Sequence, residues 1–324
     1  MKKAEKYFIL DNPIETKYKQ RMKECYYFFL CVWYRLKMLA MRVEVKEKKY
    51  NTSICAIFKN EAPYLREWIE FNHIVGVDHF YLYNNNSEDE YLGVLKPYID
   101  KGLVTLIEWP YSQMQMECYK ACIARFAQET KWLGFIDIDE FIIPKSTDSV
   151  YDFLKTFENK AGAVNIYWRL FGTSGKLNRD LKGLVCEDFT VCWPKHCDIG
   201  KCFYNTAYGF NPSSKHSSQL HHKFWANIKG ADVPPVNVFN KICIGTRNVA
   251  KSGEFPIQIN HYFTKSYKEY AMKGAKGDVY FKINPHDENY FYEHELKCTS
   301  TDYSAYKYLI QLKLRMEDEK NDKI

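Results

Sequence analysis

The sequence predicts an α/β protein built on a doubly wound, mixed but mostly parallel β-sheet with helices on both faces. Short apolar runs alternate with amphipathic helical stretches through four rounds between residues 50 and 145. Polar clusters follow three of these runs, where the carboxyl ends of parallel strands meet. The 324 residues, with 46% hydrophobic and 27% charged side chains, are enough to bury such a core.

The elements follow one another at short intervals. The predicted strands are TSICAIF (52–58), HFYLYNNN (79–86), LVTLIEWP (103–110) and KWLGFIDIDEFIIP (131–144). The predicted helices between them are YLREWIEFNHIVG (64–76), EYLGVLKPYIDKG (90–102) and QMECYKACIARFAQET (115–130). After about residue 160, short strands and many Gly, Asn and Pro residues indicate a less regular, acceptor-side region that covers the sheet edge. A last helix is expected from Tyr303 onward.

The net charge of +6 is unevenly distributed. Residues 1–50 hold thirteen Lys and Arg and six Asp and Glu, which leaves 33 basic and 34 acidic residues in the rest of the chain. A nucleic-acid-binding protein usually carries its basic surface on the folded domain. The distribution therefore argues against nucleic acid as a partner.

The N-terminal segment is basic and aromatic. Its most apolar run, YYFFLCVWY (26–34), is far shorter than the roughly 20 residues of a membrane-spanning helix. Aromatic residues beside cations suit a helix at an anionic membrane surface, and equally a helix packed on the domain with its lysines in water. The first 24 residues are polar and lack the apolar core of a secretory signal. We expect a cytoplasmic protein, with peripheral binding to the inner membrane face as one alternative.

The eleven cysteines contain no CxxC pair. Cys186, Cys192, His196, Cys197 and Cys202 form a local cluster, but their spacing matches no common zinc pattern. Buried free thiols in a reducing compartment explain these cysteines better.

The acidic run at Asp137, Asp139 and Glu140 carries the strongest chemical signal. It interrupts an apolar stretch, GFIDIDEFIIP, where isolated buried carboxylates are unfavourable unless they are paired. Alternation along a strand would direct Asp137 and Asp139 to one side and Glu140 to the other. Carboxylate oxygens suit Mn²⁺ or Mg²⁺, which would neutralise a leaving diphosphate. An acidic turn without a metal is the alternative.

Four stretches together resemble GT-A-type glycosyltransferases, in particular family 92, which is close to family 2. They are IFKNEAPYLREWIEFNHIVGVDHFYLYNNNS, KWLGFIDIDEFIIP, WRLFGTSG and INHYFTKSYKEYAMKGAKGD, spanning roughly residues 53–278 in the family's order. The resemblance implies a GT-A-like fold and a metal-dependent, inverting transfer of a hexose, with galactose favoured, from a UDP-sugar to a glycan or glycolipid. The change in pattern along the chain divides it into an N-terminal segment (1–49), a transferase domain (50–300, with a nucleotide half 50–145 and an acceptor half 146–300) and a C-terminal helix (301–324).

The resemblance also assigns roles to residues. Asp137 and Asp139 match the family's DxD motif, and His261 resembles the C-terminal histidine that completes the metal shell. The expected donor-binding residues are Lys59, Asn60, Glu61, Asn84, Asn86, Asp137 and Lys265. Lys273 and Lys276 are further cations for phosphate oxygens, unless they lie on a solvated helix face. His221 and His222 stand where the family has a histidine in a different local sequence.

The proton acceptor and the acceptor pocket are less well specified. Glu187 and Asp188 are the candidates for the catalytic base, because an inverting transfer needs a carboxylate to take the proton of the acceptor hydroxyl. An acidic loop residue without a catalytic role is the alternative. Trp168, Phe171 and Gly172 would shape the acceptor pocket, or form part of an aromatic core.

Two other functions remain open on sequence alone. A sugar-phosphate nucleotidyltransferase is disfavoured because FKNEAPYL, after the first strand, contains no Gly-rich phosphate loop. A non-catalytic membrane-associated assembly factor is disfavoured by the intact Asp137, Asp139 and His261.

Overall fold

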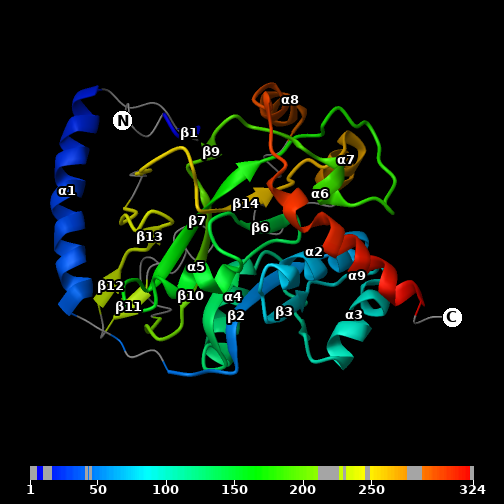
Figure 1. The fold of residues 1–324 in the computed structure, drawn as a ribbon, viewed down its shortest axis with the longest axis horizontal. Helices are drawn as coiled ribbons and strands as arrows, with labels where there is room; N and C mark the ends of the chain where they lie inside the picture. Colours follow the sequence, from blue (N-terminus) through cyan, green and yellow to red (C-terminus); the bar gives the residue numbers. More distant parts are fainter. Residues whose placement is uncertain are drawn as a thin grey trace.

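The computed structural model describes residues 6–9, 17–40, 43, 46–210, 226–228, 231–244, 249–275 and 287–321. Strands and helices alternate in its first half (Figure 1). They are β1 (Phe8–Ile9), α1 (Lys17–Ala40), β2 (Tyr50–Phe58), α2 (Ala62–Ile74), β3 (His79–Asn84), α3 (Tyr91–Asp100), β4 (Val104–Glu108), α4 (Gln115–Phe126), β5 (Thr130–Phe135), β6 (Glu140–Pro144) and α5 (Val150–Lys155).

The second half has shorter strands, as the Gly-, Asn- and Pro-rich sequence predicts. Its elements are β7 (Ala163–Leu170), α6 (Val185–Asp188), β8 (Val191–Cys192), β9 (His196–Cys197), β10 (Gly200–Asn205), β11 (Ala226–Ile228), β12 (Ala231–Val233), β13 (Val236–Asn237), β14 (Ile257–His261), α7 (Tyr267–Ala275), α8 (Glu288–Leu296), β15 (Ser300–Thr301), the 3₁₀-helix η2 (Ser304–Tyr308) and α9 (Leu309–Asn321).

A nine-stranded sheet forms the centre of the molecule. Its order is β4-β3-β2-β5-β10-β7-β14-β6, with β13 also paired to β7. The β2–β3, β2–β5, β3–β4, β7–β14 and β7–β13 pairs are parallel, whereas β10 runs antiparallel to both neighbours and β6 runs antiparallel to β14. The predicted mixed, mostly parallel sheet is confirmed.

Helices cover both faces of this sheet. Phe80 and Tyr81 are consecutive in β3, so their side chains point to opposite faces. Phe80 lies 5.3 Å, between ring centroids, from Trp68 of α2, and Tyr81 stacks at 4.2 Å on Phe126 of α4. β3 is buried along its whole length, which explains why the central residues Phe80 to Tyr83 are all apolar or aromatic and do not alternate with charged residues.

One edge of the sheet collects the carboxyl ends of its parallel strands. The pairing directions make β2, β3, β5, β7 and β14 all run the same way. The segments that follow these strands, among them residues 59–61, 85–87 and 136–139, therefore emerge at this edge. The antiparallel β10 begins there, because its direction is reversed. Ligands of open α/β sheets bind at such an edge.

The predicted fourth strand requires a correction. Residues 131–144 do not form one strand: the chain turns at 136–139 and divides it into β5 and β6. β5 pairs with β2 and β10, whereas β6 pairs with β14 at the far side of the sheet. The backbone amide of Glu140 donates to the carbonyl of Asp137 at 3.0 Å, which closes the turn. Strand alternation therefore does not set the directions of Asp137, Asp139 and Glu140.

Both predicted terminal helices are present among the described residues. α1 packs on the domain through buried Met38, and Arg35 Nη2 donates to the Asn240 carbonyl at 2.7 Å. α9 packs on α2, where Arg66 Nη2 donates to the Met316 carbonyl at 2.9 Å. In the described part of the chain, no helix combines the length and hydropathy required to cross a bilayer. The predicted boundaries at residues 49 and 300 stay predictions.

The approach of β10 to β7 gives a test of this packing. A Cβ on Gly200 would lie 1.9 Å from the Ile166 carbonyl oxygen, whereas a Cβ on Gly93 in α3 would meet nothing within 4 Å. We expect Gly200→Ala to lower the free energy of unfolding by about 3 kcal/mol through overpacking. Gly93→Ala should raise it by roughly 0.5–1 kcal/mol through helix propensity. Urea unfolding followed by circular dichroism measures both, and equal changes would contradict this packing.

Candidate functional site

The acidic turn follows β5 at the carboxyl edge of the sheet and contacts residues of β10 and β14. Asp137 and Asp139 follow the carboxyl end of β5, and Glu140 begins β6. His261, at the carboxyl end of β14, is the register partner of Glu140. The amide of Tyr262 donates to the Asp139 carbonyl at 2.9 Å, which fixes the turn against β14. Residues separated by more than 120 positions therefore form one site at the sheet edge.

Asp139 is held between an imidazole and an ammonium group. Its Oδ1 lies 3.5 Å from His261 Nε2, and its Oδ2 accepts from Lys273 Nζ at 2.6 Å. Only 8% of the Asp139 side chain is exposed. Burial alone would raise the pKa of Asp139, but the nearby Lys273 and His261 hold this pKa well below its usual range. Asp139 is therefore an ionised carboxylate at neutral pH.

Asp137 and Glu140 share a different cation, Lys201. Lys201 Nζ donates to Asp137 Oδ2 at 2.7 Å and lies 3.7 Å from Glu140 Oε2. The side chains of Lys201 and Glu140 are fully buried, whereas 29% of the Asp137 side chain is exposed. Burial and the charges of the two aspartates raise the pKa of Glu140 well above its usual range, and Lys201 offsets part of this effect. Glu140 also accepts the backbone amide of Asp137 at 3.0 Å, so it supports the turn from behind.

Lys201 is a residue that the sequence analysis missed. It comes from the start of β10, inside the run GKCFYN, all of which is buried. A single lysine in an otherwise buried strand was the available signal, because buried lysines are rare unless they are paired. The stretch around it was considered only as a possible zinc cluster.

The donor set around Asp139 fits a divalent cation. Metal–ligand distances are about 2 Å, so two ligands of one ion can be no more than about 4 Å apart. The 3.5 Å separation of Asp139 Oδ1 and His261 Nε2 meets this limit. Among the described residues, buried His261 Nδ1 has no hydrogen-bond partner, so the ring is not held by a second bond on that side. Carboxylate oxygen and neutral imidazole together suit Mn²⁺.

Asp137 does not join this pair closely. In the described part of the chain, the one group of three ligand atoms that all lie within 4.8 Å of one another is His294, Glu295 and Cys298. Asp137, Asp139 and His261 are therefore not drawn into one compact triad, because Lys201 holds Asp137 on the other side of the turn. The structure brings together Asp139 and His261, with Lys273.

The His294 group is occupied with internal contacts. His294 Nε2 bonds to the Phe171 carbonyl at 3.0 Å, and Glu295 accepts the amide and hydroxyl of Thr173 at 2.9 and 2.8 Å. A Cβ on Gly172 would lie 2.7 Å from Cys298 Sγ. These contacts join α8 to the segment that follows β7, and Gly172 permits the close approach.

The cysteine cluster considered as a zinc site is not assembled. All eleven cysteines are free, and Cys186, Cys192, Cys197 and Cys202 are buried. None of these four belongs to the group of metal-ligating atoms found among the described residues. The interpretation as scattered buried thiols is therefore the better one.

A small cavity lies beside Lys273, between the start of α2 and α7. Its lining consists of Glu61, Tyr64, Phe263, Thr264, Lys265, Glu269, Met272 and Lys273. Buried Lys265 has a left-handed backbone, with φ of 50°, and its Nζ lies 4.1 Å from the centre of the Tyr64 ring. Burial lowers the pKa of Lys265, while Glu61 and Asp139 oppose this shift. The cavity therefore joins the predicted Glu61 and Lys265 to the Asp139 centre; Lys276 lies outside the described residues.

The loops after β2 and β3 form one connected wall. The Asn60 amide donates to Ser87 Oγ at 2.9 Å, and Asn60 Oδ1 accepts the Glu88 amide at 2.7 Å. Asn84 Nδ2 donates to Glu108 at 2.7 Å, so this amide is used inside the wall. Lys59 in the loop after β2 and Asn86 in the loop after β3 are exposed beside these contacts. Asn60 and Asn86 both have φ of 54°, a backbone that Asn tolerates better than most residues.

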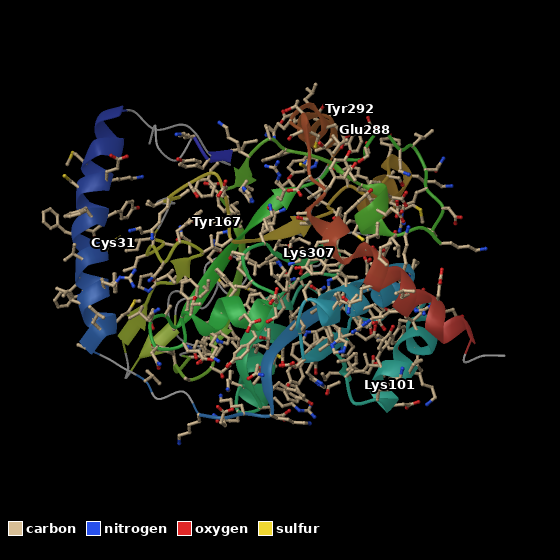
Figure 2. The ribbon with its side chains drawn as sticks, viewed as in Figure 1. Cys31, Lys101, Tyr167, Glu288, Tyr292 and Lys307 are labelled. Atoms are coloured by element: carbon tan, nitrogen blue, oxygen red, sulfur yellow. The ribbon has the colours of Figure 1, made fainter. Side chains whose placement is uncertain are left out.

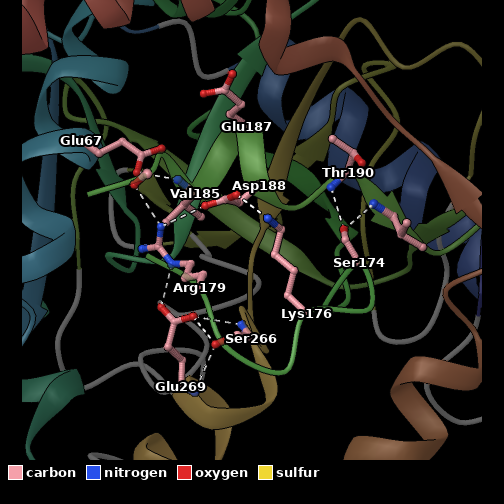
Figure 3. A network of polar contacts seen from close by, with 12 residues as sticks. Glu67, Ser174, Lys176, Arg179, Val185, Glu187, Asp188, Thr190, Ser266 and Glu269 are labelled. Atoms are coloured by element: carbon pink, nitrogen blue, oxygen red, sulfur yellow. Dashed lines mark hydrogen bonds and ion pairs between the residues drawn. The ribbon is translucent and has the colours of Figure 1, made fainter. Parts of the chain in front are cut away.

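The two candidates for the catalytic base, Asp188 and Glu187, form ion pairs away from the acidic turn. Asp188 Oδ1 accepts from Lys176 Nζ at 2.6 Å, and Asp188 Oδ2 lies 3.4 Å from Arg179 Nη1. Glu187 accepts from Lys313 Nζ of α9 at 2.6 Å. Figure 3 shows Glu187 pointing away from the contacts around Arg179. No contact between the described residues brings either acid to Asp139.

Arg179 is the centre of a second polar network that the sequence did not reveal. Its side chain is 1% exposed, and Nε donates to Glu269 Oε1 at 3.0 Å (Figure 3). Glu269 also accepts from the Tyr64 hydroxyl at 2.8 Å, which ties α7 to α2 beside the cavity. Fully buried Glu67 accepts the amides of Val185 and Cys186 at 2.7 and 3.0 Å. This network holds the walls of the cavity together.

Trp168 stands at the site, and Phe171 lies in the core. The Trp168 ring lies 4.7 Å from the His261 ring, and Lys201 Nζ is 5.9 Å from the Trp168 ring centre. Phe171 is fully buried and packs on Tyr262. The predicted acceptor role of Trp168, Phe171 and Gly172 stays a prediction, and His221 and His222 lie outside the described residues.

Comparisons with known proteins show similarity to glycosyltransferases, and one family profile matches most of the chain. The profile of Glycosyltransferase family 92 matches residues 48–289. A glycosyltransferase family 92 protein of Oryza sativa subsp. japonica is 31% identical over 143 residues, which cover 43% of this chain and 24% of that protein. A beta-1,4-galactosyltransferase of Caenorhabditis elegans is 33% identical over 112 residues (30% and 26%), and a galactan beta-1,4-galactosyltransferase of Arabidopsis thaliana is 30% identical over 126 residues (35% and 25%).

The sheet order places the protein among the open α/β folds, whose ligands usually bind at the carboxyl edge of the sheet. Within that class, the chain belongs to glycosyltransferase family 92. The aligned stretches span about a quarter of the length of these curated relatives.

The Arg179 network gives a prediction about stability. Arg179→Ala removes the cation shared by Glu269 and Asp188, whose side chains are 11% and 20% exposed. We expect a loss of about 3–5 kcal/mol of unfolding free energy, because largely buried Glu269 loses its cation and Asp188 keeps only Lys176. The control is Lys96→Ala, which breaks the exposed Lys96–Asp100 pair and should cost less than about 0.5 kcal/mol. Urea unfolding followed by tryptophan fluorescence measures the unfolding free energy of both variants. Similar losses would show that the buried network stabilises the fold no more than an exposed ion pair does.

Proposed function

We propose that the protein is a metal-dependent glycosyltransferase that moves a hexose, with galactose favoured, from a UDP-sugar to a glycan or glycolipid. One observation carries the proposal: ionised Asp139 faces His261 at 3.5 Å beside the ammonium of Lys273. Family membership supports the reaction class, and relatives that are named galactosyltransferases support the sugar.

Asp139 and His261 would hold the metal, Mn²⁺ or Mg²⁺, directly. Bound there, the ion would supply positive charge to the leaving diphosphate. Asp137, held by Lys201 but 29% exposed, would face the donor from the other side of the turn. Its distance from the Asp139–His261 pair favours an indirect contribution to the metal site over direct ligation.

The donor would lie along the sheet edge between the wall and the cavity. Lys59, Asn60, Glu61, Asn84 and Asn86 come from the two adjacent loops that would receive the nucleoside. Lys265 and Lys273 would then meet the diphosphate oxygens as point charges. Lys273 already contacts a carboxylate oxygen at 2.6 Å, so it has the reach to bind an anionic oxygen at this position.

Glu187 and Asp188 remain our predictions for the proton acceptor of an inverting transfer. Their ion pairs weigh against Asp188 in particular, because protonating it would weaken its interactions with both Lys176 and Arg179. Glu187 has one cation partner and is 39% exposed, so less is lost when it takes a proton. Glu187→Gln would then lower kcat with little change in the affinity for the donor, whereas Asp188→Asn would act mainly on stability.

The compartment is proposed from the cysteines. All eleven thiols are free and most are buried, as expected in a reducing environment. We therefore propose that the protein works in the cytoplasm. Nucleotide sugars there would have access to the donor site at the edge of the sheet.

The test measures nucleotide release from UDP-sugars with Mn²⁺, with and without EDTA. We expect UDP release that EDTA abolishes and that Asp139→Asn lowers at least about 100-fold, because the variant loses an ionised ligand. Asp302→Asn is the matched control: Asp302 is also buried, is paired with Lys145 and Arg169, and lies outside the proposed site.

The control should keep most of the activity. Full activity of Asp139→Asn, or release that is indifferent to EDTA for every UDP-sugar tested, would refute the metal site. Absence of release from UDP-sugars but release from another nucleotide sugar would refute the proposed donor.

A further inference from the structure

The N-terminal helix α1 has two different faces. Tyr27, Leu30, Cys31 and Tyr34 pack against the core, and Met38 is 5% exposed. Their spacing of three to four residues places them on one side of the helix. Figure 1 shows α1 along one margin of the molecule, and Figure 2 shows side chains that project outward from it. The inner face therefore fixes the helix to the domain.

The outer face is apolar and exposed. Met22, Tyr26, Phe29, Trp33 and Leu36 follow one another at intervals of three or four residues, and they are 59%, 61%, 69%, 62% and 59% exposed. The stripe extends for about 21 Å at 1.5 Å per residue. Other exposed apolar residues of the described chain, such as Leu296 of α8 and Leu314 of α9, lie on helices without such a run. A continuous apolar stripe of this length is typical of a binding surface.

The charge of α1 identifies the kind of partner. The helix contains six Lys and Arg residues and one Glu. At 100° per residue, Lys37 lies at the margin of the stripe, whereas Lys23 lies toward the packed side. The rest of the chain after residue 50 is close to neutral. A net-basic helix with an exposed aromatic stripe is complementary to a partner that has an apolar interior and a negatively charged surface.

We propose that the outer face of α1 binds an anionic lipid surface. Its aromatic and aliphatic side chains would enter the boundary between headgroups and acyl chains, and Lys37 at the margin of the stripe would meet the lipid phosphates. A second copy of this chain is a poorer match, because pairing two α1 helices would bring two strongly basic segments together. The sequence left a membrane-bound helix and a packed helix as alternatives, and the two faces allow α1 to be both at once.

The proposal is tested by flotation of the full chain with vesicles, which requires no knowledge of its substrate. Vesicles of phosphatidylcholine with about 30% phosphatidylglycerol should retain the protein at low salt at least about tenfold better than pure phosphatidylcholine. The double variant Phe29→Ser/Trp33→Ser should lower this binding by roughly a hundredfold, because two large apolar side chains are lost. High salt should weaken the binding of the wild type.

The matched control is Leu296→Ser/Leu314→Ser, which removes two exposed apolar side chains elsewhere and should bind as the wild type does. Circular dichroism confirms that each variant is folded. The proposal is overturned if the wild type does not bind anionic vesicles, or if Phe29→Ser/Trp33→Ser binds equally well. It is also overturned if the wild type is a dimer that this variant converts to a monomer without any vesicle binding. None of these outcomes bears on the proposed transfer reaction.

Discussion

Three carboxylates within four consecutive positions are brought to the edge of this sheet, and their charge must be compensated. Transfer of an isolated carboxylate from water into the protein interior is strongly unfavourable, and a paired one is tolerated. Fully buried Lys201 forms ion pairs with Asp137 and Glu140, and Lys273 forms an ion pair with Asp139. β10, β14 and α7 meet this requirement together, because each brings one basic or imidazole group to the same short turn.

The same compensation prepares the site for chemistry. A carboxylate held ionised by neighbouring cations is a ready ligand, and it requires no proton release when a metal binds. The lining of the cavity beside it includes two cations, Lys265 and Lys273, and two carboxylates, Glu61 and Glu269. Arg179 then fixes Glu269, so that α7 keeps Lys273 over the acidic turn. Stability and the proposed function therefore depend on the same ion pairs.

Much of the fold was predictable because its signals are local. β2, β3 and β4 each contain a short apolar stretch, and helices with amphipathic spacing lie between them, so their order predicts a parallel sheet. Asp139 and His261 were found through motifs. The break at residues 136–139 was missed because Ile136 and Ile138 preserve the apolar pattern of a strand across the turn.

The ion pairs were not predictable in the same way. Lys201 and Asp137 are 64 positions apart, and Arg179 and Glu269 are 90 positions apart. Such pairs depend on the order and register of the sheet, which no local pattern specifies. The roles of Glu187 and Asp188 depend on a bound acceptor, and their ion pairs offer a structural alternative for each.

The central claim is that Asp139 and His261 form the metal centre of a donor site. The most direct measurement is a crystal structure with Mn²⁺ and UDP, recorded at a wavelength that gives anomalous scattering from manganese. We predict one strong peak about 2 Å from Asp139 and from His261 Nε2, with the diphosphate beside Lys273. UDP bound at the sheet edge without a peak there, or a peak at His294, Glu295 and Cys298 instead, would contradict this account.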